Sequence, residues 1–136
     1  MCARENSRLC TRAGCALLCA TAVIAQEPRP EPRAIPIICE SGDCPLLTGV
    51  PQTAGMRSGF VRLVSGHTVG RHTTGGNEET LIILHGQGDA LLDGDKRISF
   101  AAPATVYFPS STFHNVVNTG KETLEYVYVV APAAGR

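Results

Sequence analysis

Short apolar segments alternate with polar turn residues along most of the chain, from Gly59 onward. The segments are rich in Val, Ile, Leu, Thr and Tyr and read FVRLVS, ETLIILH, DALLD, KRISF, TVYFP, FHNVVN and TLEYVYVV. Many short strands separated by turn residues predict a sandwich or a barrel, and Asp93-Gly94-Asp95 predicts a tight hairpin. This region has no capped run with apolar residues at helical spacing. We therefore expect an all-β fold.

The first 25 residues have a different pattern. Three arginines and one acid, Glu5, occupy the first twelve positions, a short apolar stretch follows, and Val23 and Ala25 are small residues ahead of Gln26. This order is typical of a secretory signal peptide, and the apolar run is shorter than the roughly 20 residues that span a bilayer. We expect cleavage after residue 25, a secreted or periplasmic location and no membrane attachment afterwards. The alternative is a misassigned start codon.

Residues 26–58 are predicted to form a tether and an N-terminal extension. The segment 26–36, QEPRPEPRAIP, contains four prolines among charged residues, which favours an extended linker. The stretch IPII, residues 35–38, could form a short edge strand. Cys39 and Cys44 are the two cysteines that would remain after cleavage. In an oxidising compartment they would form a disulfide, and otherwise they are free thiols in a loop.

Composition and charge exclude some classes of function. The chain has 136 residues, 43% of them hydrophobic, which is enough for one packed domain. Its formal charge is zero, and without residues 1–25 it would keep nine basic and eleven acidic residues, about −2. A nucleic-acid partner is not expected, because a basic surplus is absent. Aromatic residues make up 5% and Trp is absent, so a stacking platform for bases is also not expected.

Two spaced motifs stand out within the all-β region. Gly66 is followed by His72, by Thr74 two positions later, by Glu79 and then by Gly86. The second motif consists of Pro109, Ser111, His114 and Asn118. At these spacings the sequence resembles the cupin family, with Thr74 in the slot of the second histidine and Ser111 in a glycine slot. The resemblance implies a double-stranded β-helix, or jelly-roll barrel, over residues 59–132.

The spacing is consistent with inward-facing side chains that meet in the barrel. His72 and Thr74 share one face, because side chains two apart on a strand point the same way. By the resemblance, His72, Glu79 and His114 match positions that hold a divalent metal ion. Two histidines and one carboxylate suit Fe, Mn, Ni or Zn, and Thr74 could bond to a metal-bound water. Two alternatives remain: the fold binds only an organic molecule, or the histidines merely line a pocket.

Several neighbouring residues receive lesser roles. Glu78 is expected to face solvent, His67 to be exposed in a loop, His85 to lie at the rim and Asn118 to anchor a turn. Besides Thr74, the side chains expected to line the cavity are Phe108, Phe113, Tyr126 and Tyr128.

The function indicated is that of a metal-binding cupin acting on a small molecule, with oxygenase, lyase or isomerase chemistry all open. The alternative is a non-catalytic secreted module that binds a small ligand. The catalytic residues, the substrate and the metal are not specified by the sequence. By analogy with small cupins, the chain could form a homodimer through the segments Phe60–Val64 and Tyr126–Val130.

Overall fold

The structure, a computed structural model, describes residues 29–133. The predicted signal peptide, residues 1–25, lies outside the described residues. The described part contains eight β-strands and no helix. In chain order they are β1 Gly42–Thr48, β2 Arg57–Leu63, β3 Asn77–His85, β4 Gln87–Leu92, β5 Arg97–Ala101, β6 Ala104–Phe108, β7 His114–Asn118 and β8 Leu124–Pro132.

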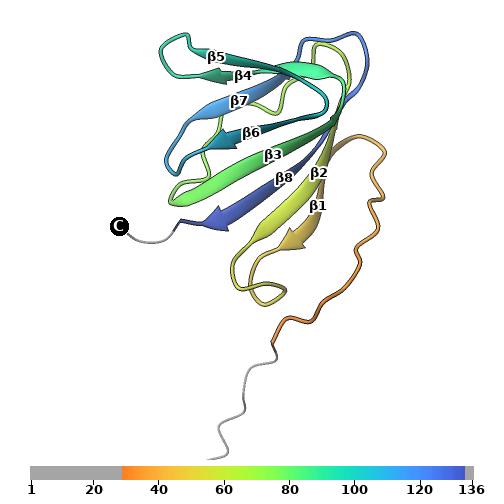
Figure 1. The fold of residues 1–136 in the computed structure, drawn as a ribbon, viewed down its shortest axis with the longest axis vertical. Helices are drawn as coiled ribbons and strands as arrows, with labels where there is room; N and C mark the ends of the chain where they lie inside the picture. The colour runs from red at the N-terminus through yellow and green to blue at the C-terminus, as the bar shows by residue number, and fades with distance from the viewer. Residues whose placement is uncertain (1–28, 134–136) are drawn as a thin grey trace, which may run out of the picture.

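The strands form two antiparallel sheets that face each other (Figure 1). One sheet has the strand order β1-β2-β8-β3-β6, and the smaller sheet has the order β5-β4-β7. The chain changes sheets between β3 and β4, between β5 and β6, between β6 and β7, and between β7 and β8. This arrangement confirms the expected all-β, double-stranded β-helix fold. No helix among the described residues is long and apolar enough to cross a membrane.

The hydrophobic core lies between the two sheets. Along β3, Glu79, Leu81 and Ile83 are buried, whereas Glu78 and Ile82 are exposed, as expected for a strand with one face inward. The fully buried core residues come from both sheets and include Leu81, Ile83, Phe108, Val116 and Leu124. Burying large aliphatic and aromatic side chains of this kind contributes about 1.5–3 kcal/mol each.

Two turns depend on backbone conformations with positive φ. Gly94 and Asp95 have φ of 70° and 58° in the turn between β4 and β5, which confirms the hairpin predicted for Asp93-Gly94-Asp95. Gly86 has φ of 80° between β3 and β4, and a Cβ atom there would lie 2.8 Å from the carbonyl oxygen of Thr123. Glycine at this motif position therefore satisfies both a backbone and a packing requirement.

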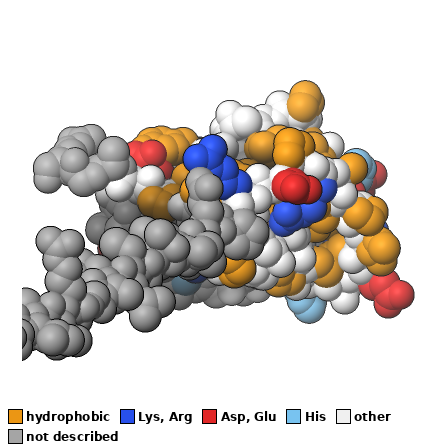
Figure 2. All heavy atoms as spheres, turned by 90° about the horizontal axis from the view of Figure 1, so that it is seen from below, with side chains coloured by type: hydrophobic (Ala, Val, Ile, Leu, Met, Phe, Trp, Pro, Cys, Tyr) orange, Lys and Arg blue, Asp and Glu red, His pale blue; other side chains and the backbone are white. Residues whose placement is uncertain are grey.

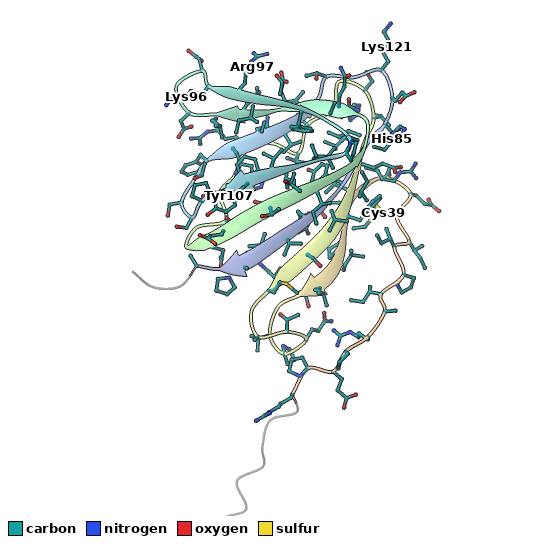
Figure 3. All side chains as sticks on the ribbon, viewed as in Figure 1. Cys39, His85, Lys96, Arg97, Tyr107 and Lys121 are labelled. Atoms are coloured by element: carbon teal, nitrogen blue, oxygen red, sulfur yellow. A yellow bond between two sulfur atoms is a disulfide. The ribbon has the colours of Figure 1, made fainter. Side chains whose placement is uncertain are left out.

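Part of the predicted extension belongs to the sheet. Strand β1 pairs with β2 along its length and forms one edge of the five-stranded sheet. The expected IPII edge strand was wrong, because residues 35–38 form no strand. The strand begins between the two cysteines instead, at Gly42, whose φ of 75° turns the chain into the sheet. Cys39 and Cys44 are joined by a disulfide at the beginning of β1, and Cys39 is labelled in Figure 3.

The segments proposed for a dimer contact lie inside the sheet. Strand β8 is bonded to β2 on one side and to β3 on the other, so neither β8 nor β2 has a free edge, and dimerisation stays a prediction. On the face shown in Figure 2, basic and acidic side chains lie among hydrophobic ones and form no continuous basic stripe. The expected lack of a nucleic-acid partner likewise stays a prediction.

Candidate metal centre

Backbone pairing brings the two motif histidines together. His72 lies in the segment between β2 and β3, and His114 is the first residue of β7. The His72 amide donates to the His114 carbonyl at 2.9 Å, and the His114 amide donates to the His72 carbonyl at 2.9 Å. The ring centroids are 4.4 Å apart. Two residues distant in the sequence are thus placed side by side.

Each imidazole is oriented by a bond from Nδ1 to a backbone carbonyl. His72 Nδ1 lies 3.0 Å from the Gly70 carbonyl oxygen, and His114 Nδ1 lies 3.2 Å from that of Thr112. A carbonyl oxygen only accepts, so Nδ1 carries a proton, and Nε2 is the nitrogen left to bind a cation. Metal-binding histidines are commonly held in this way.

Glu79 supplies the third group. It is the third residue of β3, and its side chain is 5% exposed. Its Oε2 lies 3.2 Å from His114 Nε2, and within the described residues neither atom has a hydrogen-bond partner. Leaving both of these buried polar atoms without a partner is costly. A cation between them would satisfy both.

The three side chains fit a metal ion. One ligand atom from each of His72, Glu79 and His114 lies within 4.8 Å of the other two. His114 and Glu79 are buried, and His72 is the most exposed of the three, so the site is closed on the core side and open on the other. Two nitrogens and one carboxylate leave coordination positions for water or a bound molecule.

Thr74 stabilises a turn beside the site. Its hydroxyl donates to the Asn77 carbonyl at 2.9 Å, and the Asn77 amide group donates back to the Thr74 carbonyl at 2.8 Å. The side chain lines the cavity. Because its proton is used in the turn, the hydroxyl can only accept a further hydrogen bond, for example from a water. Thr74 therefore supports the turn that leads into β3 and Glu79.

The candidate metal centre opens into a cavity of about 690 Å³. Tyr126 and Tyr128 line it together with His72, Glu79 and His114. Burial, and then the charges of Glu79 and Asp43, raise the pKa of Tyr126 far above its ordinary value. Burial, and then Asp43, raise the pKa of Tyr128 to about 12. Both hydroxyl groups are therefore neutral donors at physiological pH.

The two phenylalanines do not line the cavity. Phe108 is 1% exposed and stacks on the His114 ring with centroids 3.8 Å apart, so it lies behind the histidine and supports it from the core side. Phe113 is 40% exposed, and the Arg71 guanidinium lies 4.1 Å from its ring centroid. The expectation for Phe113 was wrong because the side chain adjacent to His114 on the chain points outward. The cation–π contact keeps it at the surface.

The remaining motif neighbours take the places expected of them. Glu78 is exposed on the outer face, where it accepts a hydrogen bond from Tyr107 at 2.9 Å. His67 is exposed, and His85 lies at the end of β3 (Figure 3), with Nε2 3.5 Å from Glu122. Asn118 donates to the carbonyls of Leu63 and Glu122 and accepts from the Gly120 amide, which makes it a buried anchor between loops.

Sequence reasoning missed the contribution of β1. Asp43, Pro45 and Leu47 from this strand line the cavity, and Arg57 at the beginning of β2 lies there as well. These positions precede the motif region, and the segment around them contains a disulfide and a proline. No strand alternation was evident there. Only the pairing of β1 with β2 places them at the cavity.

A family model described as a cupin domain matches residues 59–130. This match covers more than half of the chain, and the fold and both motifs agree with it. The chain belongs to the cupin family. None of the curated proteins matches this cupin in sequence.

Solved cupin structures resemble this one. A cupin 2 conserved barrel domain protein from Salinispora arenicola is 25% identical, with a TM-score of 0.59, over 80% of this chain and 91% of that one. An RmlC-like cupin family protein from Methanocaldococcus jannaschii is 18% identical, with a TM-score of 0.64, over 74% and 91%. The Schizosaccharomyces pombe Cnp3 cupin domain is 18% identical, with a TM-score of 0.60, over 67% and 64%. At such identities these structures support the fold alone.

Proposed function

We propose that this protein is a metal-dependent cupin that acts on a small organic molecule bound in its cavity. The observation that carries the proposal is the buried contact between Glu79 Oε2 and His114 Nε2, two atoms without hydrogen-bond partners at 3.2 Å. No hydrogen bond of acceptable geometry joins the two atoms, although they are only 3.2 Å apart. A divalent cation held by Glu79 and His114 would satisfy both atoms, and His72 would be its third ligand.

The surrounding residues determine what such a site can do. A bound divalent ion would polarise a substrate oxygen or activate water or dioxygen. The chain itself would bind the organic molecule along the apolar wall, hold the imidazoles through backbone carbonyls, and offer the neutral Tyr126 hydroxyl as a hydrogen-bond donor in the cavity. Oxygenase, lyase and isomerase reactions are all compatible with this set.

Metal retention tests the proposal. The purified protein is loaded with Fe(II), Mn(II), Ni(II) or Zn(II), desalted and measured by elemental analysis. We expect about one ion per chain for at least one metal. His72→Ala and Glu79→Gln should each weaken binding by more than about a hundredfold, because ligand loss exceeds the effect of losing a supporting group.

His85→Ala is the matched control, because His85 is exposed and lies outside the site. It should retain metal as the unmodified protein does. The proposal is contradicted if the unmodified protein keeps no metal after desalting, or if His72→Ala keeps as much as His85→Ala.

The second candidate is a secreted module that binds a small ligand without turnover. It is favoured by threonine at position 74, where the family motif has a further histidine, together with the large cavity. In that case ligand affinity would be unchanged by His72→Ala and no metal would be retained. The secreted location itself stays a prediction that detection of the chain lacking residues 1–25 in the exported fraction would test.

A further inference from the structure

We propose that Asp43 and Tyr128 form a second polar subsite in the cavity, which accepts a hydrogen bond from a hydroxyl or ammonium group of the bound molecule. The other end of that molecule would lie at His72, Glu79 and His114. This inference rests on the proposed function and specifies the class of ligand: a metal-binding group, a short apolar body and a terminal hydrogen-bond donor.

Three adjacent strands build the subsite. Asp43 on β1 pairs with Val61 on β2, and Tyr128 on β8 pairs with Gly59 on β2. A Cβ atom on Gly59 would lie 2.5 Å from the Cε1 and Cζ atoms of Tyr128. The tyrosine ring therefore lies across β2 where that strand has no side chain. Its hydroxyl reaches the carboxylate on the far strand.

The Asp43–Tyr128 pair presents only acceptors to a ligand. The Tyr128 hydroxyl forms a hydrogen bond with Asp43, which contributes to its raised pKa. A carboxylate accepts, so the phenol supplies the proton. Both residues line the cavity, and Asp43 is exposed, so the oxygens of the carboxylate and of the phenol keep acceptor capacity for a ligand there. A ligand must donate to them, as a hydroxyl or an ammonium group does.

The carboxylate is held in place although β1 is an edge strand. Cys44, the next residue, is cross-linked to Cys39, and the Cys39 thiol sulfur lies 3.8 Å from the Phe60 carbonyl on β2. Between Asp43 and the metal centre the wall is apolar, with Val61, Leu81 and Val130 among the lining side chains. Such a wall suits a hydrocarbon body that joins two polar ends.

Arg57 is a competing recognition group in the same cavity. It lies at the exposed edge of the cavity, and its charge lowers the pKa of Tyr128. If this guanidinium rather than Asp43 selected the ligand, a terminal carboxylate would bind best. The proposed subsite therefore predicts that a ligand with a hydroxyl or ammonium tail binds best, whereas selection by Arg57 predicts that a ligand with a carboxylate tail binds best.

Alkyl hydroxamates of graded chain length serve as probes, because the hydroxamate chelates metal and the tail varies between methyl, hydroxyl, ammonium and carboxylate. Binding is followed by the visible spectrum of the Co(II)-loaded protein. At the best chain length we expect the hydroxyl or ammonium tail to bind about fivefold tighter than methyl. Asp43→Asn should abolish the ammonium advantage, and Tyr128→Phe should reduce it, while both variants bind Co(II) normally.

Asp95→Asn is the matched control, because Asp95 lies in the β4–β5 turn and its φ of 58° suits asparagine. It should leave the preference unchanged. The subsite is refuted if all tails bind equally to the cobalt protein, if carboxylate binds best, or if Asp43→Asn behaves as Asp95→Asn does.

A missing metal site gives a different result. In that case the unmodified protein retains no Co(II), and the proposed function fails. The tail preference is then measured by calorimetry on the metal-free protein with alkylamines, alcohols and carboxylates. An amine or alcohol preference that Asp43→Asn removes would still support the subsite, and its absence would refute it.

Discussion

At the scale of single residues, the candidate metal site depends on neighbouring groups that orient the side chains of its ligands. The Gly70 and Thr112 carbonyls determine which nitrogen of each imidazole faces the cavity. Phe108 stacks on His114 with an angle of 6° between the ring planes. These supporting contacts convert residues with the right chemistry into a site with defined ligand directions, because a ligand whose ring can rotate loses affinity.

Substitution of Phe108 tests this support. Phe108→Ala should lower the free energy of unfolding by about 3–5 kcal/mol, because it empties a fully buried site. Phe108→Leu, which keeps most of the volume, should fold and weaken metal binding about tenfold by freeing the His114 ring. Phe113→Ala is the control and should cost about 1 kcal/mol or less by chemical denaturation. Equal losses for Phe108→Ala and Phe113→Ala would contradict the assigned roles.

At the scale of elements, strand β1 completes the cavity wall. It is an edge strand that pairs only with β2, and its register shifts between Pro45 and Leu47. An edge strand with a proline and an irregular ladder is weakly held by backbone bonds. The Cys39–Cys44 cross-link at its beginning compensates by restricting the unfolded chain.

Removal of the cross-link should loosen this strand selectively. The double variant Cys39→Ser, Cys44→Ser should lose about 2 kcal/mol of unfolding free energy, since the closed loop is short. Amide hydrogen exchange should accelerate in β1, while the central strands β3 and β8 serve as the internal control. Uniform acceleration across all strands, or none in β1, would show that the disulfide does not hold the edge.

At the scale of the whole molecule, the two sheets place ionisable groups in a partly desolvated cavity. Tyr126 is 2% exposed, and the charges of Glu79 and Asp43 add to the effect of its burial; Tyr128 interacts with Asp43. Negative charges and burial both disfavour a phenolate. Because the folded protein keeps both phenols protonated at a pH where the unfolded chain ionises them, the stability of the protein should depend on pH in the alkaline range.

This linkage predicts a loss of stability in alkali. The pKa of Tyr128 is raised from 10.0 to about 12 in the folded protein. Between these values the unfolded chain releases the proton and the folded chain keeps it, so the free energy of unfolding falls as pH rises. Tyr128→Phe should flatten the decline between about pH 10 and 12 in denaturation measurements. The difference in the free energy of unfolding between the unmodified protein and Tyr128→Phe should be constant from neutral pH to about pH 9. If the two proteins lose stability with the same slope between about pH 10 and 12, the raised pKa of Tyr128 is contradicted.

The sequence by itself determined the repeating strands, the hairpin at Asp93–Asp95 and the motif residues His72, Glu79 and His114. Strand alternation and turn preferences are local properties, and motif spacing along strands specifies which side chains share a face. The folded chain brings one ligand atom from each of these three residues within 4.8 Å of the others.

Only the tertiary structure decided which neighbours face the cavity. Phe108 and Phe113 have similar chemistry and lie close to His114 in the sequence, yet one supports the ring and the other is exposed. The entry of Asp43 into the cavity required the pairing of β1 with β2. The unpaired Glu79–His114 contact likewise exists only in the fold. Contacts between distant segments depend on strand order and register, and neither is encoded in the local pattern that a sequence displays.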